Sequence, residues 1–316
     1  MAHDLLQAIA LDIRSDLARV EEGLKAAIDS SEPLVREPAL HLLEAGGKRF
    51  RPMLVLLAGH LGDSTDARLV PCAVAIELMH LATLYHDDVI DESLVRRGVS
   101  SANAAFDNRI AILAGDYLFA RSSGIAADLG PFVSRILADT IAELCEGQII
   151  EGGDAQTTEH YLSVIDRKTA SLIAASCRLG AWLAGAPEEV VQAATRYGRA
   201  LGMAFQLSDD VLDIAGIEEQ SGKVPGTDLR EGVHTLPVLE TLAGRAEGSE
   251  ALREALGHNL IDRALEVLRS NGSIALAKGV VAEWSRRAKV ALAPAPRGAG
   301  RDALEQLADF VVDRTG

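Results

Sequence analysis

Hydrophobic and polar residues follow a helical period over most of this chain. Apolar side chains recur every three or four positions in three long stretches, residues 70–92, 111–127 and 161–184. This spacing predicts helices, each with one apolar face. Short clusters of Gly, Pro and polar residues separate the stretches. No long linker, internal repeat or low-complexity tract divides them, so residues 1–316 are predicted to form a single domain.

The predicted architecture is an all-α bundle of about ten or more helices around a central cavity. Hydrophobic residues make up 48% of the chain and aromatic residues only 4%. This composition favours helices packed through small side chains over sheets rich in β-branched and aromatic residues. In such bundles, ligand and metal sites form between the side chains of facing helices.

The formal net charge of −15 bears on possible partners. Direct binding to a nucleic acid backbone needs Lys and Arg clustered on an extended face, so no nucleic acid partner is expected. If the substrate carries phosphate, a divalent cation is the usual bridge to an acidic site.

The cysteines and the N-terminal sequence indicate a reduced cellular compartment. Cys72, Cys145 and Cys177 are far apart and lack metal-binding spacing, so they are predicted to be reduced core residues. The N-terminus has no basic region followed by an apolar stretch, and no apolar run is judged long enough for a membrane span. We therefore expect a cytoplasmic protein without a membrane anchor.

The first candidate site is an Asp-Asp-x-x-Asp motif formed by Asp87, Asp88 and Asp91. Asp87 and Asp91 are four residues apart, so they are expected on one helical face, which also carries His80 two turns earlier. A solvated acidic face is the alternative interpretation. The motif follows a long apolar run, however, where unpaired charge is costly, and this favours bound cations. Mg²⁺ suits such a motif, because it binds through one or two carboxylates and substrate phosphate.

The same pattern recurs at Asp209, Asp210 and Asp213, where Asp209 and Asp213 are again four residues apart and Gln206 shares their face one turn earlier. Carboxylates about 4 Å apart repel by roughly 1 kcal/mol in water, and by about four times that at an effective dielectric of 20. If the two motif helices face each other, several Mg²⁺ ions can lie between them and hold a diphosphate. Neutralising the diphosphate would assist its departure as a leaving group.

Basic residues accompany the acidic motifs. Lys48 and Arg51 lie in a Gly-Gly-Lys-Arg-Phe-Arg-Pro run, where the glycines loosen the backbone and Pro52 suits the first turn of a helix. Arg96 and Arg97 follow the first acidic motif, and guanidinium groups match phosphate oxygens in geometry. Each pair alone is more typical of solvated surface charge. The two pairs indicate phosphate binding only in combination with the acidic motifs.

Together, these motifs resemble those of the trans-isoprenyl diphosphate synthases, or polyprenyl synthetases, from about residue 44 to the C-terminus. The matching segments, in chain order, are 46–52, 86–91, 96–98, 115–116, 168–169, 205–213 and 222–237. The resemblance implies the isoprenoid synthase fold, a homodimer, and an enzyme that joins an allylic diphosphate to isopentenyl diphosphate. Ionisation would give an allylic cation, which the isopentenyl double bond attacks before a proton leaves to the released pyrophosphate. Glu151 departs from the family pattern, where Asp or Gln is common.

The resemblance also implies roles for single residues. The six aspartates would hold several Mg²⁺ ions bridged by the allylic diphosphate. The implied catalytic residues at the allylic site are Lys168, Thr169, Gln206 and Lys223. The implied substrate-binding residues are Lys48, Arg51, His80 and Arg97 for isopentenyl diphosphate, Arg96 for the allylic diphosphate, and Asp228.

Product length is the finer expectation. In this family the growing tail enters a tunnel below the first motif, and Ala82 and Thr83 occupy the gate, where short-chain members place aromatic residues. The small gate predicts an all-trans product of about thirty carbons or more. The alternative is a geranylgeranyl-type product, if Met79, Tyr117 or Phe119 closes the tunnel sooner. A long tail would favour peripheral contact with a membrane at product release.

Two other functions remain as alternatives. A regulatory subunit of a heteromeric synthase would keep the fold, but would not need six buried carboxylates. A class I terpene cyclase also ionises diphosphates with magnesium, but such cyclases usually lack an isopentenyl diphosphate site like Lys48, Arg51 and His80.

Overall fold

The computed structural model describes residues 9–152, 157–216 and 225–315. These residues form helices and one short hairpin, so the predicted all-α class is confirmed. The chain divides into two compact units, and each is described by itself. The first contains the described residues up to Thr140, with Ala175–Thr195 and Pro294–Leu304, and the second contains Ile141–Ala174, Arg196–Ala293 and Glu305–Gly316. The single domain expected from the sequence stays a prediction.

The elements of the first unit are α2 (Arg14–Ile28), α3 (Pro33–Glu44), α4 (Phe50–Gly59), α5 (Leu69–Ile90), β1 (Val95–Arg96), β2 (Val99–Ser100), α6 (Ala102–Ala105) and α7 (Asn108–Leu129). Those of the second are α9 (Thr158–Ile165), the π-helix η1 (Asp166–Ala170), α13 (Thr227–Arg230), α14 (Leu236–Leu242), α15 (Ser249–Gly257), α16 (Ile261–Ser270) and α17 (Ser273–Ala291). Residues of α8 (Pro131–Glu151), α10 (Ser171–Leu183), α11 (Glu188–Ala215) and α18 (Ala299–Asp313) belong to both units.

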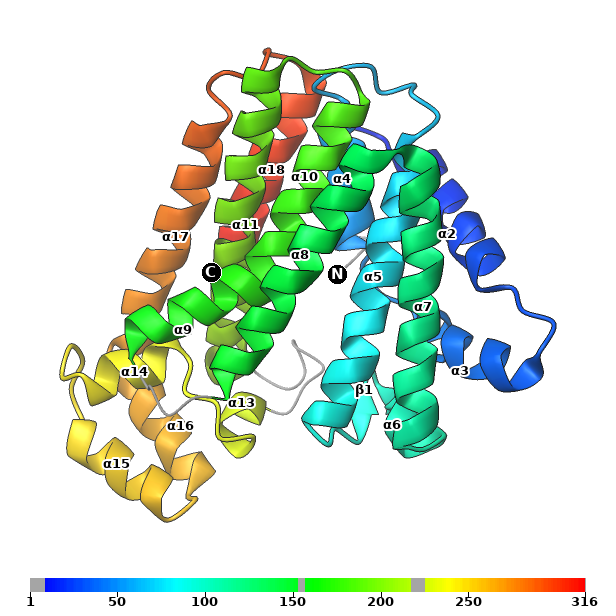
Figure 1. Cartoon of the computed structure of the whole chain (residues 1–316). Coiled ribbons are helices and arrows are strands. Elements are labelled where there is room, and N and C mark those ends of the chain that lie inside the picture. Colours follow the sequence, from blue (N-terminus) through cyan, green and yellow to red (C-terminus); the bar gives the residue numbers. More distant parts are fainter. Residues whose placement is uncertain (1–8, 153–156, 217–224, 316) are drawn as a thin grey trace. The chain divides into compact units, whose positions relative to one another are not determined.

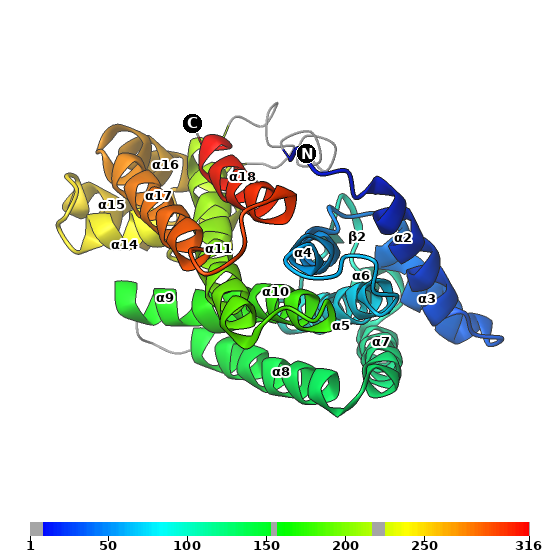
Figure 2. The same cartoon turned by 90° about the horizontal axis from the view of Figure 1, so that it is seen from above.

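Helix α5 is the core helix of the first unit and contacts α2, α4 and α7 (Figures 1 and 2). An 18-residue window within α5 has a mean hydropathy of 1.4, which is enough by length and composition to cross a membrane. No apolar run of that length was expected from the sequence. However, 67% of that window is buried inside the structure. Burial against neighbouring helices is typical of a core helix and accounts for this composition.

Two turns in the first unit need left-handed backbone. Gly46, Gly47 and Arg49 have φ values of 88°, 153° and 47° between α3 and α4, and Pro52 lies in the first turn of α4 as predicted. Arg97 and Gly98, with φ values of 55° and 79°, connect the antiparallel strands β1 and β2. A two-residue hairpin connection with both φ values positive matches the twist of its strands. This hairpin was not predicted from the sequence.

The second unit packs α14, α15, α16 and α17 around an apolar cluster that includes Val238, Leu252 and Leu268 (Figure 2). Close approach also occurs between α11 and η1. A Cβ on Gly202 would lie 2.5 Å from the Cα of Ala170, so only glycine fits there without a shift. This contact brings the helix of the second acidic motif against the segment that contains Lys168 and Thr169.

The cysteine prediction is partly wrong. Cys72 and Cys177 are buried and unbonded, as expected, but Cys145 is exposed on α8. The prediction rested on the number and spacing of the cysteines, which carry no information on whether a given side chain faces the core.

Candidate active site

The first acidic motif lies at the C-terminal end of α5, rather than within a helix as expected. Asp87 and Asp88 are in its last turn and Asp91 is the C-cap residue, whose backbone N–H donates to the Asp87 carbonyl at 2.8 Å. Asp88 is fully buried, Asp87 is half-buried and Asp91 is exposed. The end of a helix carries partial negative charge, so three aspartates there are unfavourable without a cation.

Asp88 is paired with Arg96 from β1. Nε and Nη2 of Arg96 each lie 2.6 Å from Oδ1 of Asp88. Burial raises the pKa of Asp88, and the contacts with Arg96 oppose that shift. The other oxygen, Oδ2, is buried and has no hydrogen-bond partner among the described residues. A buried acceptor of this kind is suited to a metal ion or a bound water.

The second acidic motif occupies the last two turns of α11, again near a helix C-terminus. Asp210 is buried, whereas Asp209 and Asp213 are half-buried. Both carboxylate oxygens of Asp213 accept backbone N–H groups, from Thr227 at 3.1 Å and from Asp228 at 3.2 Å. The expectation that all six motif carboxylates are buried is therefore wrong. Each motif has one fully buried aspartate, with the others nearer solvent.

A polar network joins Asp210 to the predicted allylic-site residues. Thr169 donates to Oε1 of Gln206 at 3.1 Å, and Nε2 of Gln206 donates to Oδ1 of Asp210 at 3.0 Å. The hydroxyl of Tyr161 donates to Oδ2 of Asp210. Burial raises the pKa of Asp210 to about 7, the Tyr161 and Gln206 hydrogen bonds oppose the shift, and the charges of Asp209 and Asp213 add to it. The sequence pattern gave no signal for Tyr161.

Arg314, near the C-terminus, contacts the start of the second motif. Its Nη1 lies 2.8 Å from Oδ1 of Asp209, and its other nitrogens donate to the Ser208 hydroxyl and the Phe205 carbonyl. The Arg314 side chain is 8% exposed. Sequence reasoning missed this residue, because it lies far from the motif along the chain and belongs to no recognisable spacing.

Lys168 and Thr169 lie in η1, and Lys168 forms an ion pair with Glu151. A π-helical turn inside a helical segment is often found at a functional site. Arg199 of α11 holds the first residue of η1, because its Nε and Nη2 each donate to an oxygen of Asp166 at 2.6 Å. Arg199 also bonds Glu143 of α8. These contacts of Arg199 fix the turn that contains Lys168 and Thr169.

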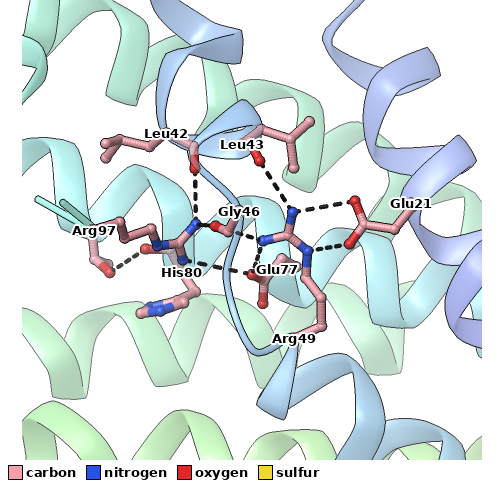
Figure 3. Close-up of polar contacts among 9 residues, drawn as sticks. Glu21, Leu42, Leu43, Gly46, Arg49, Glu77, His80 and Arg97 are labelled. Atoms are coloured by element: carbon pink, nitrogen blue, oxygen red, sulfur yellow. Dashed lines mark hydrogen bonds and ion pairs between the residues drawn. The ribbon is translucent and has the colours of Figure 1, made fainter. Parts of the chain in front are cut away.

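Arg97, His80 and the Gly46 loop lie together in the first unit (Figure 3). Arg97 donates to the carbonyls of Leu42, at 2.9 Å, and Gly46. Burial and the surrounding arginines, Arg51 first among them, hold the pKa of His80 well below its usual range, so its ring is neutral. A neutral imidazole among arginines can donate a hydrogen bond without adding charge.

The remaining predicted residues lie as follows. Lys48, in the loop before α4, and Arg51, in the first turn of α4, are half-buried. Ala82 is fully buried in α5, and Thr83 is half-buried with its hydroxyl bonded to the His80 carbonyl at 2.8 Å. Asp228 is half-buried beside Asp213. Lys223 lies outside the described residues. In the first unit, the structure brings Arg51, Arg96 and Arg97 around His80, and Arg96 also contacts Asp88. In the second, the residues brought together are Lys168, Thr169, Gln206, Asp210, Asp213 and Asp228.

The donor chemistry of both motifs fits a hard divalent cation. Within residues 9–152, 157–216 and 225–315, no three His, Cys, Asp or Glu side chains form a complete ligand set. Mg²⁺ does not need one, because it keeps several waters and completes its coordination with substrate phosphate. The buried Oδ2 of Asp88 supports cation binding at the first motif. Each motif also lies near a helix C-terminus, whose partial negative charge favours a cation.

Comparisons with known proteins identify the family of this chain. The polyprenyl synthetase family model matches residues 32–268. The chain is 44% identical to the nonaprenyl diphosphate synthase of Mycobacterium tuberculosis, over 99% of this chain and 97% of that protein. The crystal structure of a decaprenyl diphosphate synthase from Rhodobacter capsulatus superposes with a TM-score of 0.88 at 38% identity and full coverage of both chains. A polyprenyl synthase from Caulobacter crescentus, complexed with calcium and isoprenyl diphosphate, gives a TM-score of 0.90 at 33% identity, covering 100% of this chain and 98% of that one. This chain belongs to the polyprenyl synthetase family.

Proposed function

We propose that the protein is a magnesium-dependent trans-prenyltransferase that extends an allylic diphosphate with isopentenyl diphosphate. Membership of the polyprenyl synthetase family carries this proposal. The support from the structure is that each unit brings predicted site residues together: a basic cluster with the first acidic motif, and the Thr169–Gln206–Asp210 network with the second.

The acidic motifs would bind the allylic diphosphate through Mg²⁺, which neutralises charge on the leaving group. The proposed ligands are Asp87, Asp88, Asp91, Asp209, Asp210 and Asp213. Calcium with isoprenyl diphosphate in the Caulobacter crescentus relative supports a divalent cation in this role.

The chain's own residues then bind and orient the substrates. Arg96, Lys168 and Gln206 act on the allylic diphosphate, with Thr169 fixing Gln206 through their hydrogen bond. Lys48, Arg51 and Arg97 bind the isopentenyl diphosphate, and His80 donates from a neutral ring. Lys223 is assigned to the allylic site from the resemblance alone, and Asp228 is assigned as a further substrate-binding residue. No protein nucleophile is needed, because the isopentenyl double bond attacks the allylic cation.

We propose a product of about thirty carbons or more, because a small residue at the Ala82 gate leaves room for a long tail. The nonaprenyl and decaprenyl names of the relatives support long products over a geranylgeranyl-type product. The same relatives do not favour a terpene cyclase or a regulatory subunit.

The test is incubation of the purified protein with Mg²⁺, labelled isopentenyl diphosphate and each allylic starter, followed by hydrolysis and chromatographic sizing. Long products that disappear with EDTA and in Asp87→Ala support the proposal. Absence of elongation with every starter contradicts it for this chain acting alone. Product formation only after addition of a second protein would favour the regulatory-subunit alternative.

We further propose a cytoplasmic homodimer without a membrane anchor, which contacts membranes only when product is released. Sedimentation of the purified protein, with and without lipid vesicles, tests the homodimer and the membrane contact. A monomer, or tight vesicle binding without product, contradicts them.

A further inference from the structure

Glu77 is a buried acid in the middle of α5 that the proposed mechanism does not use. Its side chain is only 2% exposed, and it lies one turn before His80. A carboxylate in a helix core is costly unless charge and hydrogen bonds compensate it. Its presence in the longest apolar helix of the first unit therefore calls for a physical reason.

Arginines surround Glu77 (Figure 3). Its Oε1 accepts from Nη1 of Arg49 at 3.3 Å and lies 3.9 Å from Nη2 of Arg97. Burial raises the pKa of Glu77, and the charges of Arg49, Arg97 and Arg51 oppose that rise. Its Oε2 has no hydrogen-bond partner among the described residues. Glu77 is thus the shared counter-charge of these arginines.

Arg49 and Arg97 also donate to one piece of backbone. Arg49 donates to the Leu43 carbonyl at 3.2 Å and the Gly46 carbonyl at 3.3 Å, and Arg97 donates to the Leu42 and Gly46 carbonyls. The Leu42 and Leu43 carbonyls belong to the last turn of α3, and the Gly46 carbonyl lies in the loop that follows it. Together the guanidinium groups hold the loop that leads to Lys48.

The loop is fitted closely between these groups. A Cβ on Gly47 would lie 2.7 Å from Nη1 of Arg49 and 3.0 Å from Cζ of Arg97. Two such cations repel by about 1 kcal/mol at 4 Å in water, and by about 4 kcal/mol at an effective dielectric of 20. The carboxylate of Glu77, close to both, offsets that repulsion and allows the arrangement to exist before substrate arrives.

We propose that Glu77 is a positioning residue for isopentenyl diphosphate: through Arg49 and Arg97 it fixes the Gly46–Gly47 loop, and so the places of Arg97 and Lys48. It does not itself contact the diphosphate, because a carboxylate would repel it. This inference rests on the proposed function, in which Lys48, Arg51 and Arg97 bind that substrate.

The principal test is Glu77→Gln, which keeps the shape and removes the charge. Isopentenyl diphosphate binding is measured by calorimetry without an allylic starter, so that no turnover occurs. Loss of one charge-assisted hydrogen bond to a positioned arginine corresponds to roughly 10-fold or more in Kd. We expect that rise for isopentenyl diphosphate in Glu77→Gln, with the allylic KM within about 2-fold of wild type. Glu77→Asp should give an intermediate Kd.

The matched control is Glu21→Gln. Glu21 also pairs with Arg49, but from its outer side, and its side chain is 39% exposed. We expect its isopentenyl diphosphate Kd to stay within about 3-fold of wild type, because a more exposed pair contributes less. A purely structural role for Glu77 would instead lower the melting temperature and leave the Kd unchanged.

The outcomes separate this inference from the proposed function. Wild-type protein that does not bind isopentenyl diphosphate contradicts the function. Wild-type binding with an equal or tighter Kd in Glu77→Gln overturns the inference, since removing a negative charge near a diphosphate would by itself tighten binding. If Glu77→Gln does not fold, the isopentenyl diphosphate Kd is measured in the double variant Arg49→Met with Glu77→Met instead. Replacing a buried ion pair by apolar side chains is often neutral for stability, so this variant is expected to fold. Wild-type affinity in that variant also overturns the inference.

Discussion

Two nitrogens of Arg96, Nε and Nη2, each lie 2.6 Å from the same carboxylate oxygen of Asp88. One partner is the arginine assigned to the allylic diphosphate and the other is an aspartate assigned to Mg²⁺. Metal and diphosphate binding would therefore exchange this internal ion pair for contacts with the ligand. The site is held in charge balance before the substrate enters.

Breaking this pair should destabilise the protein, because it leaves a buried carboxylate uncompensated. For Arg96→Ala we expect a loss of about 2–3 kcal/mol in the free energy of unfolding, less than for a fully buried pair because Arg96 is partly exposed. Asp88→Asn combined with Arg96→Ala should recover at least half of the loss. Urea titration of Arg96→Ala, Asp88→Asn and the double variant without metal measures both effects, and additive losses would contradict the pairing.

Asp210 should make the metal-free protein less stable as the pH rises. Its folded pKa of about 7 exceeds the ordinary value of 3.8, so the folded state keeps a proton that the unfolded state has lost. The resulting stabilisation is present below pH 4 and disappears as the pH rises through 7, a change on the order of 4 kcal/mol. Asp210→Asn should therefore stabilise the protein more at pH 8 than at pH 5, as measured by thermal melts in EDTA. The exposed Asp313→Asn on α18 is the control, and equal effects of Asp210→Asn at both pH values would refute the assignment.

A larger side chain at the gate should shorten the product. Thr83 is half-buried, so Thr83→Phe can be accommodated more easily than a change at the fully buried Ala82, where overpacking typically costs about 1–3 kcal/mol. We expect a shorter main product from Thr83→Phe, with the first condensation retained. Leu84→Phe is the control, because Leu84 is also half-buried but points about 100° away around α5. Unchanged chromatographic chain lengths in Thr83→Phe would place the gate elsewhere.

Replacing Arg199 should raise the KM for the allylic substrate selectively. Arg199→Gln removes the paired contact to Asp166 that holds the π-helix η1, and with it the placement of Lys168 and Thr169. We expect the allylic KM to rise by roughly 10-fold, with the isopentenyl diphosphate KM nearly unchanged. Initial rates with each substrate varied in turn measure the difference. Arg196→Gln, exposed on the same helix, should behave like wild type, and a parallel change in both KM values would argue for a general loss of structure.

Much of the fold was predictable because helical periodicity is a local property of the sequence. The stretch 70–92 became α5 (Leu69–Ile90) and 111–127 became part of α7 (Asn108–Leu129). The stretch 161–184 was predicted as one helix, but it contains η1 between α9 and α10. A π-turn needs packing across the turn, here from Gly202 and Arg199, and these residues lie distant in sequence.

The sequence by itself determined the reaction class. Both Asp-Asp-x-x-Asp motifs and the basic residues that accompany them are short segments, and their residue types indicate metal and diphosphate binding. It did not determine which aspartate of each motif is buried, or that Arg96, Tyr161 and Arg314 hold these carboxylates. Nor did it reveal that Glu77 compensates Arg49 and Arg97. Tertiary structure alone decided these points, since burial and ion pairing depend on residues brought together from distant segments, and no spacing along the chain encodes them.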